Sequence, residues 1–144
     1  MIDWNFVTHR LATGGGIATA ADAAALKAAG ISHILDVREL DDQPILKGQF
    51  QYLHNPTADD GQPKPASWFA ASLVFILPAL DRPGDRVYCH CQQGRNRGPS
   101  TVFAAMIAWG LTAADAEAMI RKARPSVTLA YKADAVSAIA LLGY

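Results

Sequence analysis

One stretch, Val87–Trp109, constrains the fold more than any other part of the chain. The apolar residues before Cys91 predict a buried strand, and the apolar run from Ser100 to Trp109 predicts a buried helix. Cys91 and Arg97 stand between them, with five residues separating the two. The sequence therefore predicts a strand, a short loop and a helix in succession, with the loop at the N-terminus of the helix.

A loop in this position has a defined chemistry. Unpaired backbone N–H groups and the positive end of the helix dipole attract a dianion such as phosphate. The same field stabilises a thiolate at Cys91. The planar guanidinium of Arg97 can bind two phosphate oxygens at once. We expect the loop to bind an oxyanion beside a sulfur nucleophile.

The rest of the chain alternates between expected strands and expected helices. We expect strands at 6–13 (one strand or a pair), 31–37, 50–53 and up to Cys91, and helices beginning near Thr19, Ser67, Thr112 and Tyr131. Polar loops are expected at Arg38–Gly48 and Asn55–Pro65. This alternation predicts a single-domain α/β sandwich, in which helices flank a central and mainly parallel sheet.

Size, charge and cysteine content narrow the class of protein. The 144 residues suffice for one domain, and a formal net charge of zero argues against a generally basic nucleic-acid binder. The two cysteines, Cys89 and Cys91, alternate along one strand, which is poor geometry for a disulfide. We therefore expect a reducing compartment, the cytoplasm. No transmembrane segment or signal peptide is expected, and the sequence does not indicate an oligomeric state.

The loop also carries a family resemblance. His90-Cys91-Gln92-Gln93-Gly94-Arg95-Asn96-Arg97 resembles the HCxxGxxR signature of the cysteine-dependent protein tyrosine and dual-specificity phosphatases at all four fixed positions. The resemblance implies one phosphatase domain over residues 1–144, which hydrolyses phosphotyrosine or phosphoserine/threonine through a cysteinyl-phosphate intermediate. It implies no cofactor and no metal. The implied partner is a phosphorylated protein or a small phosphate ester, not nucleic acid.

The resemblance also implies roles for particular residues. Cys91 is the expected nucleophile, and Asp59 is the expected general acid, because its spacing to Pro63 and to Cys91 fits the family pattern; Asp60 is the reserve candidate. The expected phosphate-binding residues are Gln92, Gln93, Gly94, Arg95, Asn96 and Arg97.

Supporting roles are expected for the neighbours of these residues. His90 is expected to organise the loop through hydrogen bonds, and Gly94 to supply a backbone conformation that other residues avoid. Asn96 is expected to donate hydrogen bonds within the loop. The family usually has Ser or Thr directly after the arginine, whereas this chain has Gly98-Pro99, so Ser100 or Thr101 is expected to replace that hydroxyl. The family's water-positioning Gln has no evident counterpart.

Several alternatives stay open. Arg95 adds a second cation to the loop, which would suit a further phosphate on a phosphoinositide. The segment 34–39 resembles the Asp-Val-Arg-Glu strand end of rhodanese-like sulfurtransferases, although Asp36 and Arg38 also suit a structural ion pair. An inactive phospho-residue binding module would use the same loop.

A metal site is a further, weaker alternative. It would combine Cys89 and Cys91 with one of His9, His33 or His54, but Cys-x-Cys with a lone His is poor spacing for zinc.

Overall fold

A five-stranded sheet forms the centre of the protein, whose computed structural model describes all 144 residues. The strands are β1 (Trp4–Phe6), β2 (Leu11–Gly14), β3 (His33–Asp36), β4 (Gln51–His54) and β5 (Val87–His90), in the order β1-β2-β5-β3-β4. Strands β2, β5, β3 and β4 run parallel, and only β1 is antiparallel to its neighbour. The predicted, mainly parallel sheet is confirmed.

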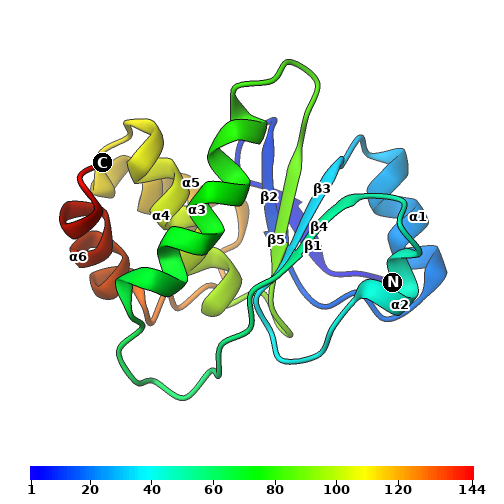
Figure 1. Ribbon diagram of the computed structural model, residues 1–144, viewed down its shortest axis with the longest axis horizontal. Coiled ribbons are helices and arrows are strands. Elements are labelled where there is room, and N and C mark those ends of the chain that lie inside the picture. The colour runs from blue at the N-terminus through cyan, green and yellow to red at the C-terminus, as the bar shows by residue number, and fades with distance from the viewer.

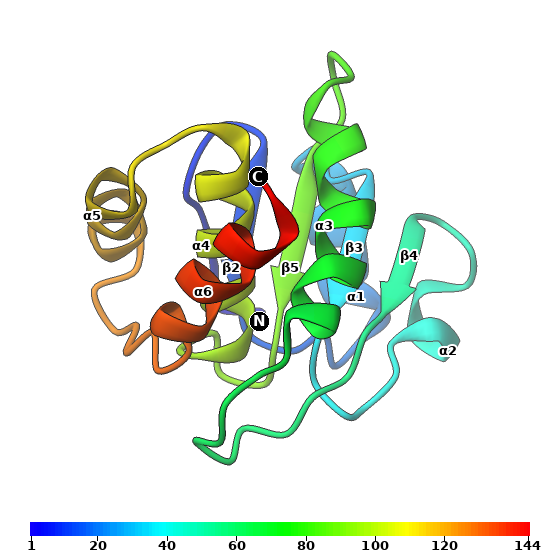
Figure 2. The same ribbon diagram turned by 60° about the vertical axis from the view of Figure 1, so that its left-hand side comes forward.

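Six helices flank the sheet on its two faces. They are α1 (Ala20–Ala28), α2 (Gln43–Leu46), α3 (Ala66–Leu80), α4 (Arg97–Trp109), α5 (Ala113–Ala123) and α6 (Lys132–Leu142). Helices α1 and α2 lie on one side of the sheet, and α3 to α6 lie on the other (Figures 1 and 2).

Local signals account for the starts of two helices. The Thr19 side chain accepts a hydrogen bond from the Asp22 N–H, and the Asp22 carboxylate accepts from the Thr19 N–H, which completes a capping box at α1. The Thr112 hydroxyl accepts from the Asp115 N–H in the same way at α5.

One segment matches an expected alternative, and another differs from the prediction. Residues 6–13, expected as one strand or a pair, lie in a hairpin of β1 and β2, and the Thr8 hydroxyl accepts from two backbone N–H groups in its turn. Within the predicted loop Arg38–Gly48, residues Gln43–Leu46 form the short helix α2. Pro44 suits the first turn of a helix, but four residues are too few for an apolar period to reveal one.

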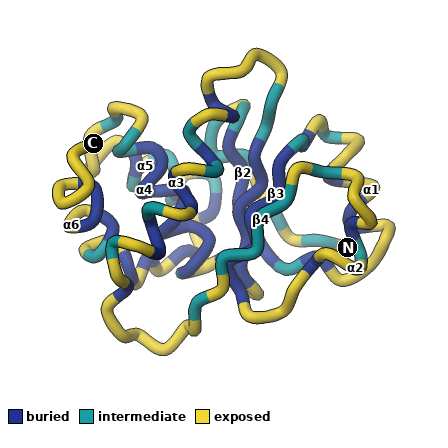
Figure 3. Tube along the Cα trace, in the orientation of Figure 1, coloured by how far each residue is buried: buried dark blue, intermediate teal, exposed yellow.

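The apolar core is divided unequally by the sheet. The cluster beneath α3 to α6 contains 24 buried residues, and the one beneath α1 and α2 contains eight. Both include residues of β5, so this strand is enclosed from both sides, as the dark central segments of Figure 3 show. The strand that leads into residues 91–96 therefore belongs to both core clusters.

The parallel strands bring separate loops to one edge of the sheet. The carboxyl ends of β3, β4 and β5 lie together, so the loops that follow them meet there. One is the mostly exposed segment 55–65, the long loop at the bottom of Figures 1 and 3. None of the helices is both long and apolar enough to cross a bilayer.

Candidate active site

The loop from Cys91 to Arg97 lies where the sequence predicts it. Cys91 follows the last residue of β5, and Arg97 is the first residue of α4. Among the loop hydrogen bonds, none uses a backbone N–H of Gln92 to Asn96 as its donor. These N–H groups are free to bind an anion.

A cavity of about 380 Å³ opens over this loop. Its lining consists of Asp59, Cys91, Gln92, Gln93, Arg95, Asn96, Arg97 and Thr128. The cavity therefore joins the loop to one residue of the segment 55–65 and to one residue that follows α5.

Gly94 is required by the path of the backbone. Its φ is +70°, a conformation that side chains strain, and a Cβ there would lie 2.5 Å from the carbonyl carbon of Gly14. The expected conformational role is confirmed. The obstacle to a side chain is the neighbouring strand β2, not a bound anion.

Arg97 is buried and anchored at the edge of the cavity. One of its terminal nitrogens donates to the carboxylate of Glu39 and, at 2.9 Å, to the carbonyl of Thr57. The Glu39 side chain is mostly exposed. Hydrogen bonds from the Glu39 backbone N–H and, second, from the Arg97 guanidinium lower the pKa of the Glu39 carboxyl. Glu39 is thus an ionised partner of Arg97 near neutral pH.

The two adjacent carboxylates differ in their surroundings. Asp59 lines the cavity and accepts a hydrogen bond of 2.8 Å from the Tyr131 hydroxyl. Asp60 instead binds the Lys64 ammonium at 2.9 Å and the Gln62 N–H, and the Lys64 contact lowers its pKa. Only Asp59 belongs to the same cavity as Cys91.

His90 is fully buried and directly precedes Cys91 in the chain. Its Nδ1 donates to the Cys91 carbonyl at 3.0 Å, and its Nε2 contacts the Asp42 carboxylate. The ring also stacks on Tyr88 with centroids 5.3 Å apart. Both ring nitrogens and one face of the ring have protein partners, which fits a role in holding the loop rather than in moving protons.

A buried cation beneath the loop explains the Asp-Val-Arg-Glu segment. The Arg38 guanidinium donates to the Asp42 carboxylate at 2.9 Å, to the Ile17 carbonyl at 3.0 Å and to the Gln92 side-chain oxygen. The backbone N–H of Arg38 donates to the Asp36 carboxylate at 3.0 Å. The segment after β3 is therefore a hydrogen-bond hub that holds the loop.

The hub also contains the one group of side chains with metal-binding geometry. Asp36, Asp42 and His90 lie close enough together for a single ion. However, the Arg38 guanidinium already supplies the positive charge, and His90 uses Nε2 for Asp42. Burial raises the pKa of Asp36 to about 6, whereas His90 and Arg38 outweigh burial and lower the pKa of Asp42.

The structure does not assemble the alternative zinc site. Cys89 is fully buried in β5, with its sulfur 3.7 Å from the Gly98 carbonyl, and burial raises its pKa. Neither it nor Cys91 belongs to a metal-capable cluster, and both are free thiols.

The hydrogen bonds of three expected supporting residues differ from one another. Asn96 does not donate within the loop: its Oδ1 accepts from the Thr128 hydroxyl and, at 3.1 Å, from the Ala130 N–H. Thr101 donates to the Arg97 carbonyl at 2.9 Å within its own helix. The Ser100 hydroxyl is buried without a partner. Of the two hydroxyls, only that of Ser100 is unused.

Gly98 leaves little space for the hydroxyl that the family usually carries at this position. A Cβ on Gly98 would lie 3.1 Å from the Cys91 nitrogen. The close passage of α4 against the end of β5 thus suits glycine, since a Cβ would require a small shift of the neighbouring backbone.

Arg124 is a site residue that the sequence analysis missed. It is buried at the end of α5 and donates to the carbonyls of Gly94 at 3.1 Å and Gln93 at 3.3 Å. It also pairs with the Asp3 carboxylate. The hydrogen bond from Arg124 is the main reason that the pKa of Asp3 is lowered. No local pattern marks such an arginine, because its partners lie about 30 and 120 residues away.

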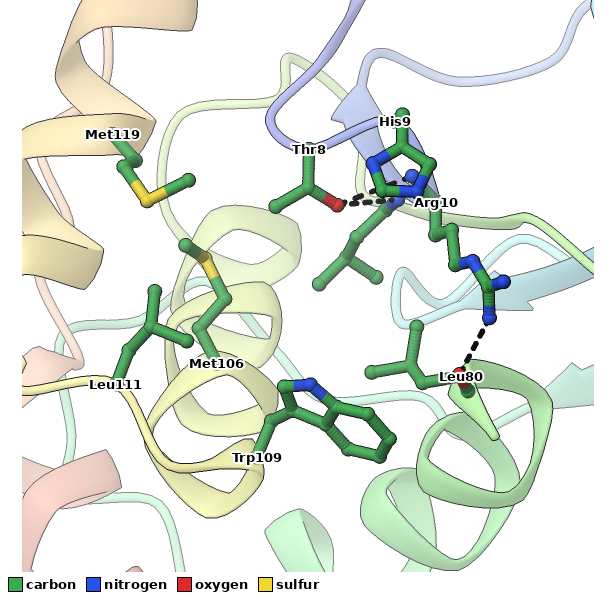
Figure 4. A pocket seen from close by; sticks show the side chains of 9 residues that line it. Thr8, His9, Arg10, Leu80, Met106, Trp109, Leu111 and Met119 are labelled. Carbon is green, nitrogen blue, oxygen red and sulfur yellow. Dashed lines mark hydrogen bonds between the residues drawn. The ribbon is translucent and has the colours of Figure 1, made fainter. Parts of the chain in front are cut away.

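A second cavity, of about 430 Å³, lies at the opposite end of the sheet. Thr8 to Leu11, Leu80, Met106, Trp109, Leu111 and Met119 line it (Figure 4). It contains no nucleophile, and Arg10 beside it donates to the Leu80 carbonyl at 2.7 Å. The cavity over Cys91 is the candidate active site.

Comparisons with known proteins agree with this geometry. Residues 15–133 match the family model described as dual specificity phosphatase, catalytic domain. PTPMT1 is 17% identical, with a TM-score of 0.80 over 96% of this chain and 95% of that chain. Human tyrosine phosphatase-like serine/threonine/tyrosine-interacting protein is 22% identical, with a TM-score of 0.81 over 96% and 97% of the two chains.

A mouse putative dual specificity phosphatase is also 22% identical, with a TM-score of 0.78 over 96% of this chain and 87% of that chain. At these identities the solved structures establish a shared fold, and the family model covers most of the chain.

Proposed function

The chain belongs to the dual specificity phosphatase family and is a phosphatase, and we propose that Cys91, Arg97 and Asp59 carry out its reaction. In this proposal residues 1–144 form one phosphatase domain that hydrolyses phosphate monoesters through a cysteinyl-phosphate. The C-x5-R loop binds the phosphate.

The first step transfers the phosphoryl group to sulfur. The Cys91 thiolate attacks phosphorus, so that an S–P bond forms while the bond from phosphorus to the leaving oxygen breaks. Asp59, in its protonated form, gives its proton to that oxygen, and the alcohol departs. Arg97 and the backbone N–H groups of the loop stabilise the equatorial oxygens.

The second step returns the enzyme to its starting state. A water oxygen attacks phosphorus while the S–P bond breaks and the Cys91 thiolate leaves. Asp59 takes the proton that the water loses, and inorganic phosphate is released. The proton given in the first step is thus recovered in the second.

One observation carries the proposal: Asp59 lines the same cavity as Cys91 and Arg97, although it comes from a different loop. The Tyr131 hydroxyl also accepts from the Gly61 N–H at 3.0 Å, which holds the segment around Asp59 over the cavity. Neighbouring Asp60 binds Lys64 instead. An acid, a nucleophile and an anion-binding loop around one cavity favour phosphoryl transfer.

The first test is hydrolysis of p-nitrophenyl phosphate by the reduced protein with a chelator present. We expect chelator-resistant turnover that falls to background in Cys91→Ser. Activity that persists in this variant would contradict the assignment of the nucleophile. A folded, reduced protein without turnover would favour the inactive phosphate binder, and thiosulfate:cyanide activity would favour the sulfurtransferase.

The cellular location and the substrate are further parts of the proposal. The two free thiols are suited to the reducing cytoplasm. A phosphoinositide remains a second candidate substrate, because Arg95 places an exposed cation on the cavity. One structure of PTPMT1, 17% identical to this chain, holds PI(5)P.

A further inference from the structure

The cavity over Cys91 has an unusually uniform lining. Apart from the nucleophile, every side chain that lines it is polar or charged, and none is aromatic or aliphatic. The bound phosphate will occupy the loop, so the other groups face the leaving alcohol. A cavity of this kind offers many hydrogen-bonding groups and no aromatic or aliphatic side chain.

Hydrogen bonds inside the protein fix how several of these groups face the cavity. The Gln92 oxygen accepts from Arg38, which leaves the amide NH₂ without a protein partner. The Asn96 oxygen accepts twice, which leaves its NH₂ free as well. The Thr128 hydroxyl uses its proton on Asn96, so its oxygen remains an acceptor.

Two further residues complete the set at the exposed part of the lining. Gln93 and Arg95 are exposed, and neither side chain makes a hydrogen bond within the protein. Arg95 supplies only donors, and the Gln93 amide supplies both donors and an acceptor. The cavity thus presents several donors and at least two acceptors.

Resting on the phosphatase function proposed above, we propose that the leaving group is a polyhydroxylated alcohol, such as a sugar or a cyclitol. Each hydroxyl of such an alcohol both donates and accepts, so it can satisfy this mixed set. The ring of phosphotyrosine would cover the same groups without bonding them, and polar groups left unpaired in this way reduce binding. We therefore expect phosphotyrosine to be a poorer substrate than a polyol phosphate.

The position of the apolar cavity supports this choice. It lies beyond Met106 and Trp109, near the C-terminal end of α4, while Cys91 and Arg97 lie at the start of that helix. The 13-residue helix spans roughly 20 Å. No aromatic or aliphatic side chain lines the cavity beside Cys91 to bind an aryl group or an acyl chain. The cavity is therefore better suited to bind a polar alcohol.

The test compares kcat/KM for glucose 6-phosphate, a myo-inositol monophosphate, phosphatidylinositol phosphate in phosphatidylcholine vesicles and a phosphotyrosine peptide. p-Nitrophenyl phosphate is measured in parallel to report the basic chemistry. We expect at least one polyol phosphate to exceed the phosphotyrosine peptide by at least about tenfold, the effect of one or two lost hydrogen bonds. Turnover of vesicles alone would assign the polyol to a lipid headgroup, and turnover of the soluble esters to a free metabolite.

Two variants test the contacts. Gln93→Leu keeps the side-chain size but removes its hydrogen bonds, and Arg95→Ala removes the free cation. Each should lower kcat/KM for the preferred polyol phosphate about tenfold more than for p-nitrophenyl phosphate. Lys122→Ala, an exposed charge on α5 away from the cavity, should change neither.

The outcomes separate the two proposals. A phosphotyrosine peptide that is turned over as well as or better than every polyol phosphate would overturn the inferred substrate class and leave the phosphatase function intact. Equal losses on both substrates in Gln93→Leu and Arg95→Ala would also overturn it. Absence of p-nitrophenyl phosphate hydrolysis would refute the phosphatase function itself.

Discussion

Replacing Asp42 by alanine is expected to destabilise the protein strongly, although Asp42 does not line the cavity. Its carboxylate is fully buried and binds two groups, the Arg38 guanidinium at 2.9 Å and His90 Nε2. Arg38 in turn binds Gln92, and His90 binds the Cys91 carbonyl. Asp42 therefore connects the hub after β3 to two consecutive residues of the loop.

The magnitude follows from what the substitution leaves behind. The side chains of Arg38 and His90 are 5% and 0% exposed, so neither can turn to water when the carboxylate is removed. Removing one partner of a buried ion pair costs about 3–5 kcal/mol, because the remaining charge is uncompensated. Asp42→Asn keeps an oxygen for Arg38 and should lose less than Asp42→Ala.

Urea unfolding at pH 7 measures the loss, and hydrolysis of p-nitrophenyl phosphate measures the effect on the loop. Asp81→Ala is the matched control, since it removes an exposed carboxylate and should stay within about 0.5 kcal/mol of the unmodified protein. We expect Asp42→Ala also to lower kcat/KM, because the loop loses two supports. A loss of less than about 1 kcal/mol in Asp42→Ala would refute the reasoning.

Three further predictions concern the site and its support. Asp59→Asn should lower kcat about 10²–10⁴-fold on an alkyl phosphate, while Asp60→Asn should have little effect; the reverse pattern in steady-state rates would exchange their roles. Gly94→Ala should destabilise the protein by at least about 1–2 kcal/mol, owing to its φ of +70° and the 2.5 Å approach to Gly14, and a thermal shift of zero would contradict this. Asp36, whose pKa is raised by burial to about 6, favours folding in its protonated form, so its contribution is present below pH 4 and is lost as the pH rises to about 6. The difference in unfolding free energy between the protein and Asp36→Asn should change across that window, and a constant difference would show that burial does not shift this group.

The sequence predicts those features that depend on neighbours in the chain. The capping box of Thr19 and Asp22 involves residues three positions apart, and the strand before Cys91 and the helix after Arg97 follow from apolar patterns. Family and phosphatase function also follow from one short signature, and the family model confirms both. These features need no knowledge of distant contacts.

Features that depend on distant contacts could not be predicted in this way. Spacing in the sequence favours Asp59 over Asp60, but their different surroundings arise from Tyr131, more than 70 residues away from Asp59, and from Lys64. Asn96 accepts from residues beyond α5, and Arg124 reaches both Asp3 and the loop. Such contacts depend on how helices pack, which no local pattern encodes.

The contact between Gly94 and Gly14 has a consequence for how this protein can change over evolutionary time. A Cβ on Gly14 would itself collide with Asp3 and with Trp4, the first residue of β1, so three backbone segments are stacked without side chains between them. Neither glycine can be enlarged alone. Gln93 and Arg95, by contrast, are exposed and carry no structural side-chain contact. Mutations can therefore accumulate at these two positions at little cost in stability, and under the substrate proposal above such single steps would alter substrate preference.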